Sequence, residues 1–220
     1  MNTEEKSVRV WDLPTRLFHW ALVVLIALQF ATAEFGFLSM QWHYRFGWAT
    51  LALIVFRVLW GFAGSQTSRF ADFVRGPRAV AGYVRAMFSA PAHIGHNPLG
   101  GWSVVAMLLC VLAQAMSGLF ASDGIDEDGP FVDAVSGATV KLATRLHHLG
   151  ENVLLILIAL HIAAVLLHRL LKHDDLITPM ITGRKPAAQP APMRFVSGWR
   201  ALLLFLVVAA LTLALASQGQ

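Results

Sequence analysis

The sequence is poor in cysteine and in charge. Among its 220 residues there is one cysteine, Cys110, and only 14% are Asp, Glu, Lys or Arg. A single cysteine excludes an intrachain disulfide, and the lack of a Cys-x-x-Cys-His sequence excludes covalent haem attachment at such a motif. With so few charges and a hydrophobic content of 56%, the chain is not an ordinary soluble domain, and its composition indicates an integral membrane protein.

Five apolar segments are long enough to cross a bilayer, whose hydrocarbon core of about 30 Å requires about 20 residues of helix. They cover residues 15–38, 43–63, 101–121, 145–171 and 199–217. The stretch between the last two is rich in proline and alanine and is predicted to be a linker. We therefore expect an all-α membrane protein with five spans.

Charged residues between the spans predict the orientation. The connections after the second and fourth spans are rich in arginine and lysine, whereas residues 123–133 after the third are acidic. Basic loops stay in the cytoplasm, so the N-terminus is predicted to be cytoplasmic and the C-terminus periplasmic. Because the basic residues flank apolar spans, the net charge of +4 gives no reason to expect a nucleic-acid partner. A competing interpretation is that residues 1–33 form a signal peptide ending near Ala31-Thr32-Ala33.

Four histidines lie at the predicted ends of spans in two layers. His147 and His161 are fourteen residues apart on one helix, so at about 100° per residue their rings share a face about 21 Å apart. His43 begins the second span on the side of His147, and His19 begins the first span on the side of His161. Ionisable residues inside a membrane usually have partners and a function. We therefore predict two b-type haems, one held by His43 and His147 and one by His19 and His161.

Other arrangements of the histidines are less well supported. Zinc needs about four ligands around one centre, which two separated layers do not supply. His148 projects about 140° away from His161. His168 shares the face of His161, but it lies near the expected membrane edge, where we favour a snorkelling or surface role.

Four arginines lie near the predicted ligands in sequence or on the same helical face: Arg16, Arg45, Arg57 and Arg145. A b-type haem carries two propionates, and the guanidinium group binds carboxylates through two parallel hydrogen bonds. We predict that these arginines contact the propionates. The alternative is that they snorkel to the interface or only set the orientation of the spans.

Several short segments resemble one known family. Phe18-His19-Trp20, Trp42-His43, the spacing of His147 and His161, and the segment 95–101 (GHNPLGG) are similar to the bacterial cytochrome b561 and nickel-iron hydrogenase cytochrome b family. The resemblance covers about residues 8–185. It implies a four-helix di-haem domain over 1–185, the same two ligand pairs, and a place in the bacterial inner membrane. Residues 186–198 would then be a linker and 199–217 an extra transmembrane helix outside the four-helix core.

The resemblance also implies electron transfer between the quinone pool and a periplasmic redox partner such as a c-type cytochrome. The alternative is a self-sufficient quinone oxidoreductase with its own small-molecule donor or acceptor. Because no soluble catalytic domain is evident, we favour the electron-transfer subunit and assign no catalytic residue.

Two loops are predicted to carry the reactants. A quinone site is expected near His96 and Asn97 on the cytoplasmic side, because histidine changes charge near neutral pH and the Asn amide can hydrogen-bond a quinone oxygen. The alternative is that these residues only form the turn that caps the third span. The acidic loop 123–133 is expected to dock a basic or c-type carrier, or alternatively only to remain soluble.

Overall fold

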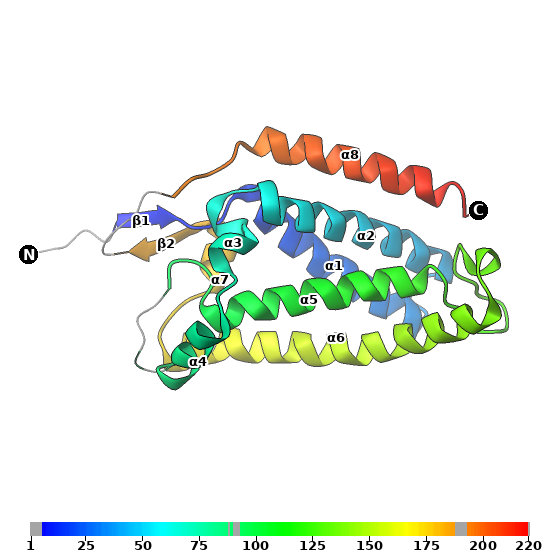
Figure 1. Ribbon diagram of the computed structural model, residues 1–220, viewed down its shortest axis with the longest axis horizontal. Helices are drawn as coiled ribbons and strands as arrows, with labels where there is room; N and C mark the ends of the chain where they lie inside the picture. The colour runs from blue at the N-terminus through cyan, green and yellow to red at the C-terminus, as the bar shows by residue number, and fades with distance from the viewer. Residues whose placement is uncertain (1–5, 88, 90–92, 188–192, 220) are drawn as a thin grey trace, which may run out of the picture.

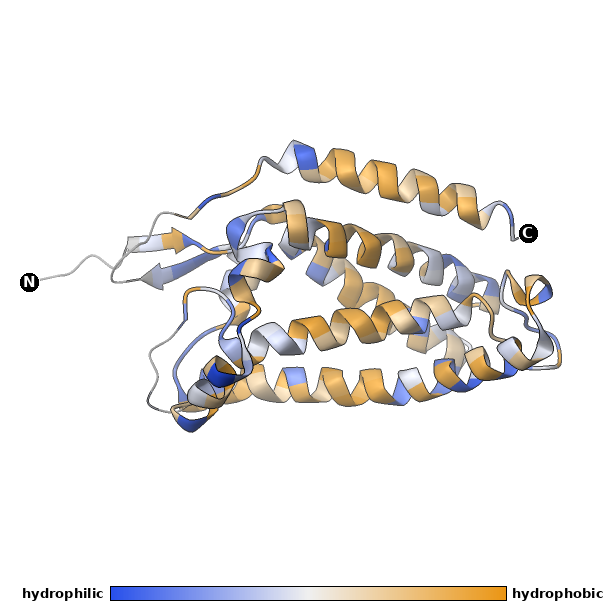
Figure 2. Ribbon diagram, viewed as in Figure 1, coloured by the Kyte–Doolittle hydropathy of each residue, from blue (hydrophilic) through white to orange (hydrophobic). Residues whose placement is uncertain are grey.

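The computed structural model describes residues 6–87, 89, 93–187 and 193–219 of the chain. Within these residues, five helices are long and apolar enough to cross a membrane. They are α1 (Leu13–Phe35), α2 (Met40–Ala63), α5 (Pro98–Gly118), α6 (Gly137–Leu171) and α8 (Gly198–Ala216). The helices are apolar along most of their length, and polar residues gather at their ends (Figure 2). The prediction of an all-α protein with five spans is therefore confirmed.

Most predicted boundaries lie within three residues of the observed ones, but α6 begins at Gly137, eight residues before the predicted position 145. The Ser136 side chain caps this helix by accepting a hydrogen bond from the Thr139 amide at 3.3 Å. The resulting helix has 35 residues, well above the length of about 20 that a bilayer requires. The first turns of α6 therefore extend beyond the apolar segment predicted from the sequence.

The starts of α1 and α5 are fixed by side-chain caps. Asp12 accepts from the Thr15 amide at 2.9 Å, and Asn97 accepts from the Gly100 amide at 2.7 Å. In both helices a proline occupies the first turn, where its missing N–H costs no helical hydrogen bond. These caps define where the chain enters the bundle at the end that carries His19 and His96.

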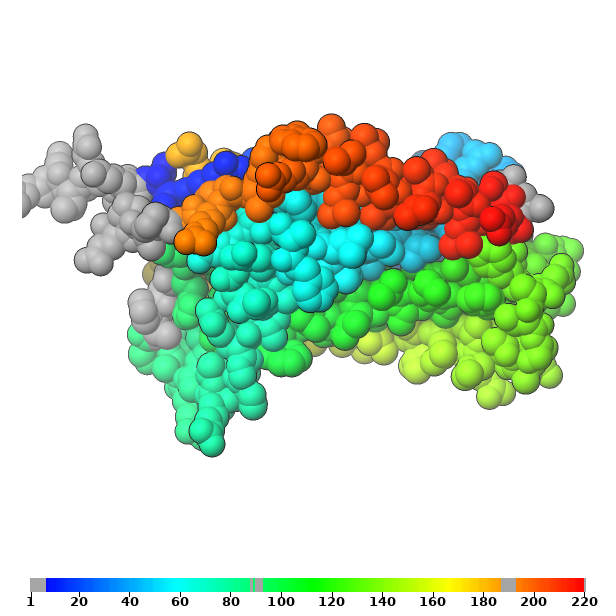
Figure 3. All heavy atoms as spheres, turned by 45° about the horizontal axis from the view of Figure 1, so that its top comes forward, coloured from blue at the N-terminus to red at the C-terminus, as the bar shows by residue number. Residues whose placement is uncertain are grey.

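Helices α1, α2, α5 and α6 form the bundle, with α1 against α2 and α5 against both α2 and α6 (Figure 1). The fifth helix, α8, lies along α2 and covers one side of the bundle (Figure 3). The Phe205 ring on α8 meets Phe56 on α2 edge to face at 5.8 Å. Ile54 and Trp60 of α2 are almost completely buried, so α2 is the central helix of the core.

A small two-stranded sheet joins the N-terminal and the C-terminal segments of the bundle domain. Strand β1 (Lys6–Arg9) pairs antiparallel with β2 (Arg184–Ala187), so that Ser7 lies opposite Pro186. The predicted linker 186–198 therefore begins inside a strand. The pairing was missed because the partner strands are separated by most of the chain, and no local pattern reports such a contact.

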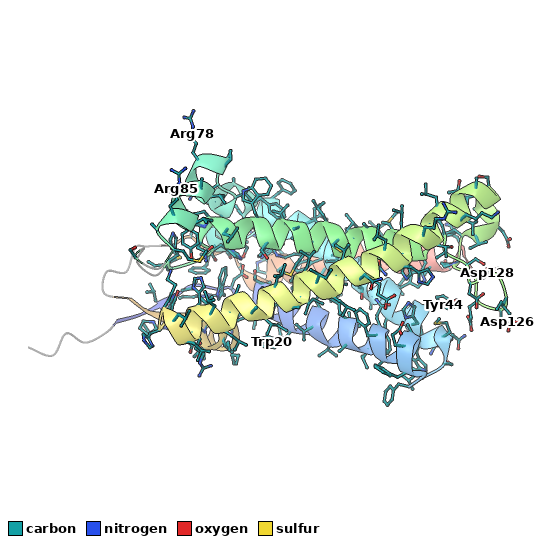
Figure 4. The ribbon with its side chains drawn as sticks, turned by 90° about the horizontal axis from the view of Figure 1, so that it is seen from below. Trp20, Tyr44, Arg78, Arg85, Asp126 and Asp128 are labelled. Atoms are coloured by element: carbon teal, nitrogen blue, oxygen red, sulfur yellow. The ribbon has the colours of Figure 1, made fainter. Side chains whose placement is uncertain are left out.

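Short helices line the connections at both ends of the bundle. They are η1 (Gln66–Ser68), α3 (Phe70–Phe73), α4 (Pro77–Arg85), η2 (Val132–Ala134) and α7 (Ile177–Thr182). Figure 4 shows Arg78 and Arg85 of α4 at one end of the molecule and Asp126 and Asp128 of the acidic loop at the other. This separation of charge along the helix axes agrees with the alternating path predicted from the loops.

Candidate functional site

The structure brings the four predicted ligands together as two pairs. The ring centroids of His43 and His147 are 6.4 Å apart, and those of His19 and His161 are also 6.4 Å apart. A metal bound to two imidazoles at about 2 Å from each nitrogen, with each nitrogen about 1 Å from its ring centroid, requires centroids roughly 6 Å apart. Each pair is therefore spaced to hold one haem iron between its rings.

The residues around the pairs favour a haem over a bare metal ion. Within the described part of the chain, no group of three or more His, Cys, Asp or Glu residues could hold a metal ion. A haem iron, in contrast, needs only axial ligands from the protein, because the macrocycle supplies the others. Two facing imidazoles in an apolar bundle satisfy that need.

Hydrogen bonds to backbone carbonyls orient the His43–His147 pair. The Nδ1 of His43 lies 3.3 Å from the Gln29 carbonyl oxygen, and the Nδ1 of His147 lies 3.0 Å from the Gln114 carbonyl oxygen. When Nδ1–H donates to a carbonyl, the Nε2 lone pair is left for the iron, and the ring cannot rotate freely. These partners could not be recognised from the sequence, since carbonyl groups are present at every residue.

Glycine makes room for one of these rings. A Cβ on Gly118 would lie 2.9 Å from Cε1 of His147, closer than side-chain carbons normally approach. A Cβ on Gly47, one turn after His43 on α2, would meet nothing within 4 Å. The small residue at 118 is therefore required by the position of His147, whereas the one at 47 leaves space beside the ligand face.

The His19–His161 pair has a different environment. The Nδ1 of His19 is enclosed and has no hydrogen-bond partner among the described residues, and no hydrogen bond from His161 is found there either. Next to His19, the Trp20 Nε1 donates to the Met180 carbonyl oxygen at 3.2 Å, and Arg16 donates to the Ile181 carbonyl oxygen. Two side chains of α1 thus attach this helix to the backbone of α7. The position of His19 is set by these contacts of its helix, because its ring has no such hydrogen bond.

The four arginines fall into two groups. Arg57 is 2% exposed, and its Nη1 is enclosed without a partner among the described residues. The Nε of Arg16 is likewise enclosed without a partner. Buried unpaired donors are costly, so both fit a carboxylate such as a haem propionate. Arg45 is exposed and lies over the Trp42 ring at 4.7 Å, and Arg145 is exposed, so their contact with a propionate stays a prediction.

A buried carboxylate next to Arg57 was missed from the sequence. Asp12 is completely buried and accepts from Trp60 Nε1 at 3.0 Å, in addition to capping α1. Its negative charge acts on Arg57, and Ser68 contacts the same carboxylate at 3.4 Å. An Asp just before a helix signals a cap, but only the folded chain shows that its second oxygen joins α1 to α2.

His96 and Asn97 take different roles at the start of α5. Asn97 provides the cap described above, which was the alternative considered for it. The His96 ring lies 4.7 Å from Trp11 and 4.4 Å from Phe73, and its Nδ1 is enclosed without a partner among the described residues. Burial, and then the charge of Arg57, lowers the pKa of His96 to about 3. The expectation that His96 changes charge near neutral pH is therefore wrong, since the ring stays neutral there.

His168 was assigned to the surface from its sequence position, and that prediction is wrong. Its side chain is buried, with 7% of the residue exposed. The Nε2 lies 3.3 Å from the Tyr83 hydroxyl, and the Nδ1 lies 3.6 Å from Asp174. The spacing of one heptad from His161 indicated that His168 lies on the same helical face. Its nearness to the expected membrane edge led to the wrong prediction of a surface position.

The acidic loop is ordered by its own carboxylates. Oδ1 of Asp123 accepts from the amides of Ile125, Asp126 and Glu127 at 2.8 to 3.1 Å, and these hydrogen bonds lower the pKa of Asp123. Glu127 accepts from the Tyr44 hydroxyl at 2.9 Å. Because Tyr44, labelled in Figure 4, follows His43 on α2, this contact connects the loop to the helix that carries the predicted ligand.

A helical bundle that carries paired histidines on facing helices is the architecture of a membrane cytochrome b. Residues 10–183 match the sequence model described as prokaryotic cytochrome b561, and the chain belongs to this family. The family implies haem b and electron transfer within a membrane, so the chain is a multi-pass membrane protein of electron transport.

Comparison with curated proteins finds relatives in three bacteria. A probable Ni/Fe-hydrogenase B-type cytochrome subunit of Rhizobium leguminosarum bv. viciae is 24% identical over 83% of this chain and 90% of the relative. Proteins of the same description in Azotobacter vinelandii and Azotobacter chroococcum mcd 1 are each 21% identical over 82% of this chain and 89% of the relative. No solved structure gives a significant match.

Proposed function

We propose that the chain transfers electrons across the bacterial inner membrane through two b haems. His43 and His147 hold the haem near the acidic loop, and His19 and His161 hold the other. The observation that carries this proposal is the equal 6.4 Å separation of the two ring pairs. When bound, haem b accepts and passes on single electrons, and the surrounding protein tunes its potential.

The roles of the other residues follow from their contacts. The carbonyl groups of Gln29 and Gln114 hold the rings of His43 and His147 in orientation. Arg57 and Arg16 supply enclosed positive charge near the other pair and are suited to bind propionates. Helix α8 covers α2 and keeps the aromatic core around Phe56 away from lipid.

The orientation proposed from the loops places the N-terminus in the cytoplasm and the C-terminus in the periplasm. The α4 arginines and the acidic loop lie at opposite ends of the bundle (Figure 4), which supports this assignment. The haem held by His43 and His147 would then be on the periplasmic side, and the one held by His19 and His161 on the cytoplasmic side.

The redox partner is proposed to meet the periplasmic side. The names of the relatives favour a nickel-iron hydrogenase as that partner, and a c-type cytochrome is the alternative from the sequence. Asp126 and Asp128 lie at the tip of the molecule, where complementary charge would steer a basic surface into place (Figure 4).

The quinone site is proposed beside His96 and Asn97. The enclosed His96 Nδ1 can form one hydrogen bond to a quinone oxygen, and the rings of Trp11 and Phe73 offer an apolar surface to the head group. The charge of Arg57 already acts on His96. Asn97 keeps its amide nitrogen for the ligand, because its cap uses only Oδ1.

The proposal is tested by purifying the protein in detergent, extracting the cofactor and recording a reduced-minus-oxidised spectrum. We expect two non-covalent haems per chain and reduction of both by a quinol or by an added partner. One haem per chain, or none, would contradict the two-pair arrangement. Turnover of quinol with a small-molecule acceptor and no protein partner would favour the alternative of a self-sufficient quinone oxidoreductase.

A further inference from the structure

A second set of titratable side chains lies buried at the end of α6, away from the proposed haem ligands. His168 and Asp174 are 7% and 6% exposed, and Tyr83 from α4 is 6% exposed. Lys185 from β2 completes the set. The α4 residue Tyr83 is therefore brought together with three polar side chains from residues 168–185 at one enclosed place.

The contacts order these groups in a line. One Asp174 oxygen lies 2.5 Å from Lys185 Nζ. The other lies 3.6 Å from Nδ1 of His168, which is longer than a hydrogen bond, and this nitrogen is enclosed without a hydrogen-bond partner among the described residues. On the far side of the same ring, Nε2 lies 3.3 Å from the Tyr83 hydroxyl. A carboxylate, an imidazole and a phenol thus follow one another, and each can both lose and regain a proton or a hydrogen bond.

Packing alone does not account for this line. Burying polar groups is costly unless they are fully paired, and an apolar residue at the position of His168 would fill the space at lower cost. The turn after α6 is already stabilised by a backbone hydrogen bond, which the Asp174 amide donates to the His168 carbonyl oxygen at 3.1 Å. The imidazole and the phenol are therefore additional to what the turn requires.

The line leads toward the loop of the proposed quinone site. The Tyr83 ring meets the His93 ring edge to face at 5.4 Å, and Lys185 Nζ donates to the His93 carbonyl oxygen at 3.0 Å. His93 is three residues before His96. At the other end, Asp174 follows the exposed His173 in the turn after α6. The Tyr83 end of the line thus meets the His93 ring, and the Asp174 end follows the exposed His173 in sequence and reaches the same loop through Lys185.

We propose that Asp174, His168 and Tyr83 form a proton relay between the cytoplasm and the quinone site. This inference rests on the proposed function, because quinone reduction consumes two electrons and two protons and quinol oxidation releases both. In the reduction direction, His168 gains a proton at Nδ1 from the side of Asp174 and gives one from Nε2 to the Tyr83 oxygen. The phenol at the same time gives up its own proton, whose final acceptor is the reduced quinone oxygen, so each hop conserves protons.

The charges around the relay fit this role. His96 stays neutral at ordinary pH, so it hydrogen-bonds the quinone but does not store the proton, and a separate donor is required. Burial, together with the charge of Asp174, raises the pKa of Tyr83, which therefore remains a phenol. The Lys172 ammonium lies 5.4 Å from the centre of the Tyr83 ring. In the described part of the chain, the charged or titratable groups that face the relay are Lys172, Lys185 and His93.

The relay is tested with the purified holoprotein in detergent and duroquinol as the probe. Haem reduction by duroquinol and by dithionite is followed in stopped-flow experiments across a pH series, in water and in deuterium oxide. The variants are Tyr83→Phe and His168→Phe, and the control is His173→Asn at an exposed position with φ of 50°, a conformation that Asn tolerates.

We expect both relay variants to slow the reaction with duroquinol by about tenfold or more, as loss of a proton-transfer group does. Their pH profile and solvent isotope effect should also differ from wild type, which a purely structural role would not cause. Haem spectra and reduction by dithionite should be unchanged, and His173→Asn should match wild type throughout.

Wild-type duroquinol rates and pH profiles in Tyr83→Phe would overturn the relay while leaving the quinone site intact. If His168→Phe loses its haem spectrum, Tyr83→Phe decides the question, because it removes a single oxygen atom. A wild-type protein that reacts with dithionite but not with duroquinol would instead contradict the proposed quinone function, and the relay with it.

Discussion

The two histidine pairs have the same spacing but are supported in different ways. His43 and His147 each have a backbone carbonyl within hydrogen-bond distance of Nδ1, and Gly118 leaves room for one of the rings. His19 and His161 lack such partners in the described residues, and buried charges of both signs, Arg57 and Asp12, lie close to the turn of α1 that holds His19.

The comparison shows two ways in which a protein can adjust a haem site. Hydrogen bonds from a ligand ring mainly fix its orientation and its basicity. Enclosed charges mainly act on the energy of the oxidised and reduced states, because they are weakly screened away from water. We therefore expect changes in the surroundings of the two pairs to have different effects. Around His43 and His147 they should cause loss of haem, and around His19 and His161 they should shift the haem potential.

The largest effect is expected from the ligands themselves. Replacing His43 or His147 by Ala should remove the haem of that pair and leave the other, so that about half of the haem is lost. Replacing His19 or His161 should remove the other half. Haem quantitation and spectra at two redox potentials distinguish these results, with His148→Ala, an exposed neighbour, as the control. Loss of the same haem from the His19 and His43 variants would refute the pairing.

The next largest effect is expected from Gly118→Ala. The added methyl group would meet the His147 ring at 2.9 Å, so the ring must shift and the hydrogen bond to Gln114 must weaken. Loss of such orientation typically lowers metal affinity by about 10- to 100-fold. Haem retention during detergent washing measures this loss, and Gly137→Ala, at the start of the helix that carries His147 and with nothing within 4 Å, is the matched control. Equal haem retention in the two variants would show that the ring is not fixed in this way.

A smaller effect, of another kind, is expected from Arg57→Gln. An enclosed positive charge near the His19 pair repels the oxidised haem, which carries one more positive charge than the reduced haem. Removing it should therefore stabilise the oxidised state and lower the potential of that haem by on the order of tens of millivolts. A redox titration followed by optical spectra would measure it, with Arg78→Gln, an exposed arginine of α4, as the control. If the other haem shifts instead, Arg57 is assigned to the wrong pair.

The smallest effect concerns stability in acid. His96 has a pKa of about 3 in the folded protein but takes up a proton near pH 6.5 when unfolded. Between these values the unfolded state binds more protons, so stability falls as the pH falls below about 6.5. His96→Phe should therefore flatten the decrease in Tm between neutral and mildly acidic pH, measured by thermal unfolding in detergent. Asp123→Asn is the control from the other end of the molecule, since its depressed pKa matters only below its ordinary value of 3.8. An unchanged slope in His96→Phe would mean that the ring is not held neutral by burial.

Much of the fold was predictable because its signals are local. An apolar run of about 20 residues indicates a span whatever surrounds it, and all five spans were located in this way. The heptad spacing of His147 and His161 fixes their common face through the helical repeat alone. The ligand pairs needed only one further assumption, an alternating path through the membrane.

What the sequence could not provide depends on contacts between distant segments. The pairing of β1 with β2, the burial of His168 beside Tyr83, and the joining of α1 to α2 through Asp12 each bring together residues from separate parts of the chain. The same is true of the pKa of His96, which depends on burial beneath rings from two other segments. Helical periodicity and hydropathy determined the spans and the ligand faces, because both are properties of one segment. The tertiary structure alone decided which polar groups are enclosed and what they meet, because desolvation and pairing depend on all the segments that pack around a side chain.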